Sequence, residues 1–493
     1  MKRELGLFSA VMMGLSGSIG FEVFVLMDYA YFGLAGSSLV LALLLGGLIN
    51  LLIMFSYCEL SAAIPEVGGE YTYTKAAYGG FVAFASGCLR WLASVFGAAL
   101  AALTFVRQLS YFFSTTPGLE AIFSASMPLV AIIAIVILAM LDIKGARQAG
   151  TMLVVLFLAI FAIFLASGFW HGLTPLNILP KSAPDDLSGV LAATAYVFPM
   201  FFGMRALVAG ASQIKNPEKN VPRAILLSAL LIIPLYCGIA YVAVGVTPGE
   251  GPLLNLAAHE TMGVAGGILF AIAGMVASLS ALGTSISVQS SIARGMSRDG
   301  YLPKILLLVH RRFGTPYIAT ILGSLFIIFF SAMGPVEFLG YAASFGSILV
   351  FAVVSLSLLK LRKKKPHLKR AFKAPLYPLT PVAGVVMSFV LLMSPIFVGD
   401  VNAINALMSG WGLMALVLLT YYLRMMGRYR LRVAIGGMSL GMGIFTAILT
   451  YLSQTKLVPM TLSSGSLYVL ISFSIVSILA GVLNVTTRTP KIF

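Results

Sequence analysis

Residues 14–22 read Gly14-Leu15-Ser16-Gly17-Ser18-Ile19-Gly20-Phe21-Glu22 and lie inside an apolar run from about Leu5 to Phe32. Such a run can cross a bilayer, because roughly 20 apolar residues at about 1.5 Å each cover a hydrocarbon core about 30 Å thick. The glycines disfavour a continuous helix, since each costs roughly 1 kcal/mol relative to Ala in a helix interior. Unwound backbone at membrane depth occurs only where protein or a water-filled cavity covers it. The sequence therefore predicts a broken helix whose freed N–H and C=O groups bind a polar ligand.

The composition indicates an all-α polytopic membrane protein. Of the 493 residues, 59% are hydrophobic and 10% are charged, whereas soluble domains carry about 25% charged residues. Cys58, Cys88 and Cys237 lie in apolar runs, so neither a disulfide framework nor a metal site is indicated. No nucleophile–base pair or phosphate loop is present, so we expect neither an enzyme nor an organic cofactor. The basic segment 360–373 is interpreted as a topology anchor against anionic lipid, and no nucleic-acid partner is expected.

Apolar runs of about 20 residues predict about fourteen transmembrane helices. We place both termini in the cytoplasm, because nearly all Lys and Arg then fall in cytoplasmic segments. The exceptions are Arg107, Lys181 and Lys456 on the outer side and Arg90 and Arg205 within the membrane. The first apolar run continues directly into a second, so no cleavable signal peptide is indicated.

The first ten predicted spans divide into two halves of five. The interrupted first span has a counterpart in the sixth, at residues 195–205, where Pro199 and Gly203 break the apolar run. Paired interruptions in two halves are the best sequence indication of a transporter binding site. Because five is odd, the second half enters the membrane from the opposite side, and the repeat is inverted. The predicted domains are the first repeat at 1–169, the second repeat at 188–361 and peripheral C-terminal helices at 376–493.

Several motifs resemble the amino acid-polyamine-organocation (APC) transporter superfamily. Residues 57–73, from Tyr57-Cys58-Glu59-Leu60 to Gly69-Glu70-Tyr71-Thr72-Tyr73, follow its Y-x-E-L-x-x-x-x-P-x-x-G-G-x-Y-x-Y loop. Residues 215–225 are similar to its K-N-P-x-x-x-x-P-x-A-I element. Residues 293–304, followed by Gly314-Thr315-Pro316, are similar to its A-R-D-G-x-L-P-K and G-T-P elements. Together the matches cover the first ten predicted spans.

The resemblance implies the five-plus-five inverted-repeat fold of the leucine-transporter type. The count of apolar runs adds about four C-terminal helices outside that repeat. It also implies that the first and sixth spans unwind around the substrate, where half-helix N-termini favour a carboxylate and C-terminal ends favour an ammonium group. The residues of the first span that would face the carboxylate are Gly17, Ser18, Ile19, Gly20 and Phe21. Those of the sixth span that would offer carbonyls and aromatic walls are Tyr196, Phe198, Phe201 and Phe202, with ordinary helix packing as the alternative.

Two places depart from the family pattern. Where the sixth span of the family carries G-F-E, this chain has Gly203-Met204-Arg205, and Ser212-Gln213 stand where two further carboxylates are usual. Where the first span carries a small triplet such as G-S-G, this chain has Gly20-Phe21-Glu22. A carboxylate therefore replaces a small residue, and a guanidinium replaces a carboxylate. For this reason the family's substrate specificity is not transferred to this chain.

Glu22, Arg90 and Arg205 all fall within predicted spans. An unpaired charge at the bilayer centre costs several kcal/mol, so each needs a partner or a water-filled cavity. Each is a candidate coupling or gating residue, with a structural ion pair as the alternative. Because Glu22 and Arg205 each follow the glycine of their repeat by two residues, we expect them to be linked, directly or through water, in at least one conformation. Arg90 is the competing partner for Glu22.

Thr284 and Ser285 resemble the adjacent hydroxyls that sodium-coupled members of this fold use beside carbonyls of the first span. Hydrogen bonding within the membrane helices is the alternative for both. The coupling ion is left open between H⁺ and Na⁺.

The sequence thus predicts a plasma-membrane permease that carries an amino acid or related organic amine by alternating access. One alternative is a polyamine or organic-cation transporter or exchanger, for which Glu22 would supply the counter-charge. The other is a membrane sensor or complex subunit that keeps the fold without transport. The sequence indicates neither the substrate nor the oligomeric state.

Overall fold

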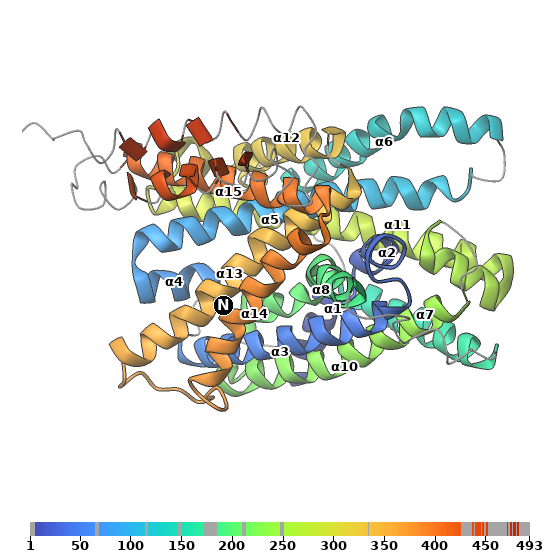
Figure 1. The fold of residues 1–493 in the computed structure, drawn as a ribbon, viewed down its shortest axis with the longest axis horizontal. Coiled ribbons are helices and arrows are strands. Elements are labelled where there is room, and N and C mark those ends of the chain that lie inside the picture. Colours follow the sequence, from blue (N-terminus) through green and yellow to red (C-terminus); the bar gives the residue numbers. More distant parts are fainter. Residues whose placement is uncertain are drawn as a thin grey trace, which may run out of the picture. The chain divides into compact units, whose positions relative to one another are not determined.

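We describe the protein from a computed structural model (Figure 1). The residues that the structure describes are 5–64, 69–113, 117–145, 150–171, 185–209, 213–246, 251–333, 335–424 and short segments between 436 and 482. The chain divides into two compact units, Met1–Ser394 and Pro395–Phe493. Within the described residues every regular element is a helix, and an isolated β-bridge joins Leu5 to Ile214.

The helices of the first unit include long apolar segments and short irregular turns. In chain order they are α1 (Leu7–Ser18), α2 (Glu22–Tyr29), η1 (Ala30–Ala35), η2 (Gly36–Ser38), α3 (Leu39–Ala63), α4 (Glu70–Tyr78), α5 (Gly80–Ser110), α6 (Pro117–Ile143), α7 (Gly150–Trp170), α8 (Asp185–Val197), η4 (Phe198–Met204), α9 (Arg205–Ala209), α10 (Pro217–Val246), α11 (Leu253–Arg298), η6 (Lys304–Leu307), α12 (Tyr317–Met333) and α13 (Val336–Lys364). They are followed by α14 (Leu379–Val398) and, in the second unit, α15 (Val401–Arg424).

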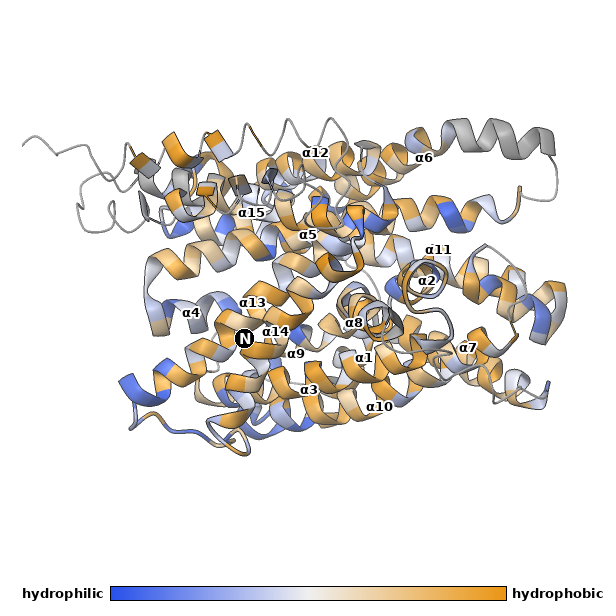
Figure 2. Ribbon diagram, viewed as in Figure 1, coloured by the Kyte–Doolittle hydropathy of each residue, from blue (hydrophilic) through white to orange (hydrophobic). Residues whose placement is uncertain are grey.

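Nine helical segments of the described chain are long and apolar enough to cross a membrane. Hydrophobic residues run along most of these helices, and hydrophilic residues gather near their ends (Figure 2). The protein is therefore a multi-pass membrane protein. The total of fourteen helices, the inverted repeat, its boundaries at 1–169, 188–361 and 376–493, and the orientation of the termini stay predictions.

Both predicted interruptions are present. The first helix ends at Ser18 and restarts as α2 at Glu22, with residues 19–21 unwound between them. In the second, α8 ends at Val197 and a 3₁₀ segment, η4, leads into the short helix α9. Pro199 lies at the start of η4, where its missing N–H and fixed φ disfavour continuation of the α-helix. The sequence signals of Gly and Pro were therefore sufficient to locate both breaks.

Long helices surround the two breaks. The segment α1 packs against α10 and η4, while α3 lies alongside α10 (Figure 1). The helix α5 packs against α4, α6, α11, α12 and α13, so it connects many parts of the first unit. Side chains along α5 can therefore connect different helices of the first unit.

Candidate functional site

The two breaks touch through their backbones. A Cβ built on Gly17 would lie 2.5 Å from the carbonyl oxygen of Gly203 and 2.8 Å from its Cα. A Cβ built on Gly203 would collide with backbone atoms of Gly17 and Ser18. Real Cβ atoms essentially never come within 3.0 Å of another heavy atom, so both positions require glycine. The last turn of α1 and the 3₁₀ segment η4 therefore meet with no side chain between them.

A tyrosine of α10 binds a freed carbonyl group at this junction. The buried hydroxyl of Tyr236 donates a hydrogen bond of 2.5 Å to the Ser18 carbonyl oxygen, and the Met200 carbonyl oxygen lies 3.4 Å away. The Ser18 hydroxyl is also buried, and it has no hydrogen-bond partner among the described residues. At this junction the Ser18 carbonyl oxygen therefore accepts a hydrogen bond from the protein, whereas the Ser18 hydroxyl has no hydrogen-bond partner among the described residues. Tyr236 was not predicted, because a tyrosine in an apolar span gives no signal that distinguishes it from a packing residue.

The predicted aromatic residues lie in three different packing environments. Phe201 packs against Tyr236, with ring centroids 5.6 Å apart. Phe198 and Phe202 contact each other and the Phe351 ring of α13. Tyr196 lies away from these rings, against Tyr29 and Tyr341, and Ile19 and Phe21 of the first break are buried. The structure thus brings Phe198, Phe201 and Phe202 to the junction, and contact of any of these residues with substrate stays a prediction.

Glu22 lies at the first residue of α2 with its carboxylate turned back on the break. The carboxylate occupies the space that a Cβ on Gly20 would need. Helix N-termini attract negative charge through the aligned peptide dipoles. Within the described residues Glu22 forms no ion pair at 4.0 Å or less. The N-terminus of this half-helix is therefore occupied by the chain's own carboxylate.

Arg205 begins α9, and its side chain is only 9% exposed. Its Nε donates to the Phe202 carbonyl oxygen at 3.2 Å. The guanidinium carbon lies 4.4 Å from the centroid of the Phe202 ring and 5.1 Å from that of Phe351, within the range of cation–π attraction. Its Nη1 is 3.7 Å from Glu70 Oε1 and has no hydrogen-bond partner in the described part of the chain. Arg205 is thus held on one side, while Nη1 is left without a hydrogen bond.

Glu70, the first residue of α4, lies between the two predicted intramembrane arginines. Its Oε2 is 3.8 Å from Arg90 Nε, and its Oε1 is the carboxylate oxygen near Arg205. The Tyr57 hydroxyl donates to Oε1 at 3.0 Å. In this structure both arginines are therefore paired with Glu70 rather than with Glu22. The link between Glu22 and Arg205 in another conformation stays a prediction.

A second ion pair lies near the C-terminal end of α5. Arg107 Nη2 is 3.2 Å from Asp28 Oδ2, and the first N–H of α11, at Leu253, donates to Asp28 Oδ1 at 2.9 Å. Asp28 is buried. Arg90 and Arg107 are about 25 Å apart along α5 by helical rise. Two positions along this helix, Arg90 in its first half and Arg107 near its C-terminal end, are therefore each connected to a different group of helices through a carboxylate.

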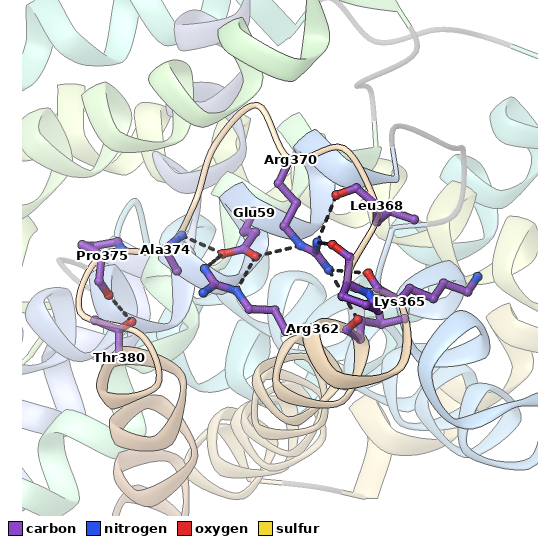
Figure 3. Close-up of polar contacts among 10 residues, drawn as sticks. Glu59, Arg362, Lys365, Leu368, Arg370, Ala374, Pro375 and Thr380 are labelled. Atoms are coloured by element: carbon purple, nitrogen blue, oxygen red, sulfur yellow. Dashed lines mark hydrogen bonds and ion pairs between the residues drawn. The ribbon is translucent and has the colours of Figure 1, made fainter.

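The family-motif residue Glu59 forms the most fully hydrogen-bonded ion pair of the described chain. Arg362 donates to its two carboxylate oxygens at 2.8 and 2.6 Å, Arg370 Nε lies 3.2 Å away, and the backbone N–H of Ala374 donates at 2.7 Å (Figure 3). Glu59 is fully buried. This cluster fixes α3 to the end of α13 and to the loop that follows. The interpretation of 360–373 as a lipid anchor is therefore incomplete, because two of its arginines bind Glu59.

Another motif contact joins α4 to the loop after α11. Lys75 Nζ and the Tyr71 hydroxyl both donate to Asp299, at 2.7 and 2.5 Å. Burial raises the pKa of Asp299, but these hydrogen bonds outweigh burial and hold the pKa below its ordinary value. The two motifs that contain these residues are therefore physically connected.

The predicted sodium-site hydroxyls lie on α11. Thr284 is exposed, and its hydroxyl donates to the Ser280 carbonyl oxygen at 2.9 Å, which is the backbone bonding given above as the alternative. Ser285 is partly buried. Ion binding by this pair stays a prediction.

Comparison with known proteins identifies the family. A family model described as "Amino acid permease" matches residues 5–423. The branched-chain amino acid permease BcaP of Bacillus subtilis (strain 168) is 29% identical over 446 residues, which cover 86% of this chain and 94% of that protein. The methylthioribose transporter of the same organism is 28% identical over 409 residues, covering 78% and 87%. Its serine/threonine exchanger SteT is 26% identical over 424 residues, covering 83% and 95%. The chain therefore belongs to the amino acid permease family of the APC superfamily and is a multi-pass membrane permease, not an enzyme.

Proposed function

We propose that the protein is a secondary active transporter that carries an amino acid or a related organic amine by alternating access. The substrate binds where the two broken helices meet. The backbone contact between Gly17 and Gly203 carries this proposal, because irregular backbone in a membrane is stable only inside protein or beside a cavity. The names of the relatives, which include a branched-chain amino acid permease and a serine/threonine exchanger, support a small amino acid as cargo.

The ion pairs that Arg90 and Arg107 of α5 form act as alternating closures in this proposal. With the N-terminus in the cytoplasm, Glu70 lies on the cytoplasmic side of the junction and Asp28 on the outer side. Opening to one side separates Asp28 from Arg107, and opening to the other separates Glu70 from Arg90 and Arg205. Glu22 is a candidate proton carrier, and Thr284 with Ser285 is the candidate sodium site.

Uptake into proteoliposomes tests the proposal. Purified full-length protein is reconstituted, and accumulation of labelled amino acids and amines is followed with pH and sodium gradients imposed separately. We expect saturable accumulation driven by one gradient, and its absence in a Gly20→Leu variant that is reconstituted to the same density. If no labelled compound accumulates or exchanges under any gradient, a non-transporting role is indicated. Accumulation of polyamines alone would assign the protein to organic-cation transport.

A further inference from the structure

We propose that Arg205 binds the acid group of the substrate, and that Glu70 is an internal carboxylate which neutralises Arg205 while the site is empty. This inference rests on the proposed function and narrows its substrate class. The cargo is a small molecule that carries a carboxylate, as an amino acid does, and amines without a carboxylate are excluded.

The hydrogen-bonding capacity of Arg205 is only partly used. Arg362 shows what a satisfied arginine looks like in the same protein, with donor–acceptor distances of 2.8 and 2.6 Å to the two oxygens of Glu59. In contrast, Arg205 Nη1 is 3.7 Å from Glu70, beyond hydrogen-bond range, although its side chain is only 9% exposed. A carboxylate forms such bidentate pairs at about 2.7–2.9 Å. Arg205 therefore has the geometry of a buried guanidinium without its full complement of acceptors.

The unused donor belongs to the junction of the two breaks. Arg205 follows Gly203 by two residues, and Gly203 touches the backbone of Gly17 and Ser18. The Ser18 hydroxyl is the second buried polar atom at this junction without a hydrogen-bond partner in the described chain. A buried polar group left without a partner costs about 1–3 kcal/mol. Two such groups beside the helix breaks indicate a missing polar ligand, and the guanidinium of Arg205 is the one that carries the charge to bind a carboxylate.

The contacts of the guanidinium restrict the direction from which a ligand can approach. The faces of Phe202 and Phe351 lie against the guanidinium, and the Phe202 carbonyl oxygen accepts from Nε. These contacts occupy Nε and the faces of the guanidinium, so an acid group would bind Arg205 through its terminal nitrogens. The planar arrangement of those donors fits a carboxylate better than a single oxygen acceptor.

Glu22 removes the other place where an acid group could bind. The N-terminus of the half-helix α2 would attract an anion, but the Glu22 carboxylate turns back onto it. A second carboxylate at that position would be repelled by Glu22. The acid group of a substrate therefore needs a positively charged group other than this helix N-terminus. Arg205 is a buried cation at the junction.

A substrate acid can displace Glu70 from Arg205, because Glu70 also contacts Arg90 and Tyr57. Its carboxylate is 3.7 Å from Arg205 and 3.8 Å from Arg90, while its hydrogen bond of 3.0 Å is with the Tyr57 hydroxyl. A substrate acid that binds Arg205 leaves Glu70 paired with Arg90 and Tyr57. The exchange of one carboxylate for another then keeps Arg205 neutralised throughout.

A comparison of amino acid and carboxamide binding tests whether Arg205 binds the acid group of the substrate. The probes are the common L-amino acids and their carboxamides, which keep the ammonium group and the side chain but lose the carboxylate. Dissociation constants are measured on the purified full-length protein from ligand-dependent thermal stabilisation, using the acid–amide pair that binds most tightly. In the unmodified protein we expect the acid to bind roughly ten- to a hundredfold more tightly than its amide. In Arg205→Gln we expect that ratio to fall to about one through loss of acid binding alone.

Three further variants complete the experiment. Glu70→Gln removes the internal competitor, so we expect the acid to bind more tightly and the amide to be unaffected. Glu70→Gln combined with Arg205→Gln removes both members of their ion pair, leaving only Arg90 without its carboxylate, and it tests the ratio even if Arg205→Gln alone fails to fold. Lys75→Gln breaks the ion pair with Asp299, to which no role in transport is assigned, and we expect it to leave the acid–amide ratio unchanged.

The outcomes separate this inference from the proposed function. Equal losses of acid and amide binding in Arg205→Gln would give Arg205 a structural role and overturn the inference. Amides or simple amines that bind as well as the acids in the unmodified protein would also overturn it, while leaving transport of organic amines in place. If no probe binds and no labelled compound is transported, the proposed function fails, and the inference fails with it.

Discussion

Gly17 and Gly203, from the two broken helices, are in direct backbone contact, and neither has room for a Cβ. We expect Gly203→Ala to destabilise the protein by about 1–3 kcal/mol, because an added methyl group would force two backbones apart. Gly17→Leu is expected to lose stability as well as substrate binding, whereas Gly20→Leu, which would meet only the Glu22 side chain, is expected to abolish substrate binding in a protein that still inserts and folds. Thermal unfolding in detergent, paired with a binding assay, provides the measurement.

Matched glycine variants provide the controls for this prediction. A Cβ added to Gly97 in α5 would meet no heavy atom within 4 Å, so Gly97→Ala is expected to be neutral or slightly stabilising. Gly20→Ala is expected to be milder than Gly203→Ala, because its Cβ would meet the movable Glu22 carboxylate rather than backbone. Equal effects of the three alanine substitutions would contradict the backbone contact.

A double-mutant cycle distinguishes the two possible partners of Arg205. Stability is measured for Glu70→Gln, Arg205→Gln and the double variant, and then for the same cycle with Glu22→Gln. We expect a coupling energy of about 0.5–3 kcal/mol for Glu70 with Arg205, since these side chains approach within 3.7 Å. The cycle with Glu22 is expected to be closer to additive in this conformation. Strong coupling to Glu22 and none to Glu70 would instead favour the pair that the repeat symmetry predicts.

The Glu59 cluster is expected to be among the least tolerant polar sites of the first unit. Replacing Arg362 with Met removes both short hydrogen bonds and leaves a fully buried carboxylate partly unpaired, at a cost of about 3–5 kcal/mol. The neighbouring Lys363 is exposed, so Lys363→Met serves as a control with an expected change within about 0.5 kcal/mol. The stabilities of the two variants are compared by chemical or thermal unfolding under the same conditions. Similar losses of stability would show that the Arg362–Glu59 contact contributes little.

Acid is expected to weaken the contact between α4 and the loop after α11. The pKa of Asp299 is lowered in the folded protein, so its charged form adds stability above the unfolded pKa of about 3.9. This contribution is lost as the pH falls through the lower, folded pKa. The melting temperature of the unmodified protein is therefore expected to fall more steeply below about pH 4 than that of Asp299→Asn. Parallel curves for the two proteins would show that the contact contributes nothing.

The sequence predicted the breaks but not the partners of the charges beside them. Gly17, Pro199 and Gly203 act locally, through backbone entropy, a missing donor and close approach, so their effect can be read from short segments. Glu70 lies in a loop motif expected outside the membrane, and its pairing depends on how α4 returns toward α5 and α9. A requirement for a carboxylate near Arg90 and Arg205 could be predicted, but its identity required the tertiary structure.

The basic segment 360–373 shows a second limit of sequence reasoning. Its composition predicts contact with anionic lipid, and Lys363, Lys364 and Lys365 are indeed exposed. Arg362 and Arg370 instead turn inward to Glu59, which lies about three hundred residues earlier in the chain. Charge counting treats all basic residues of a segment alike, whereas side-chain direction separates them into two groups with different roles.

The Glu59 cluster also constrains how this chain can diverge. A lineage that loses Glu59 first leaves two guanidinium groups facing each other, and one that loses Arg362 first leaves a buried carboxylate. Each single-step intermediate is less stable than either the complete cluster or a fully apolar replacement. The acid at position 59 and the arginines at 362 and 370 are therefore expected to be inherited together among orthologues, and to disappear together where they are lost.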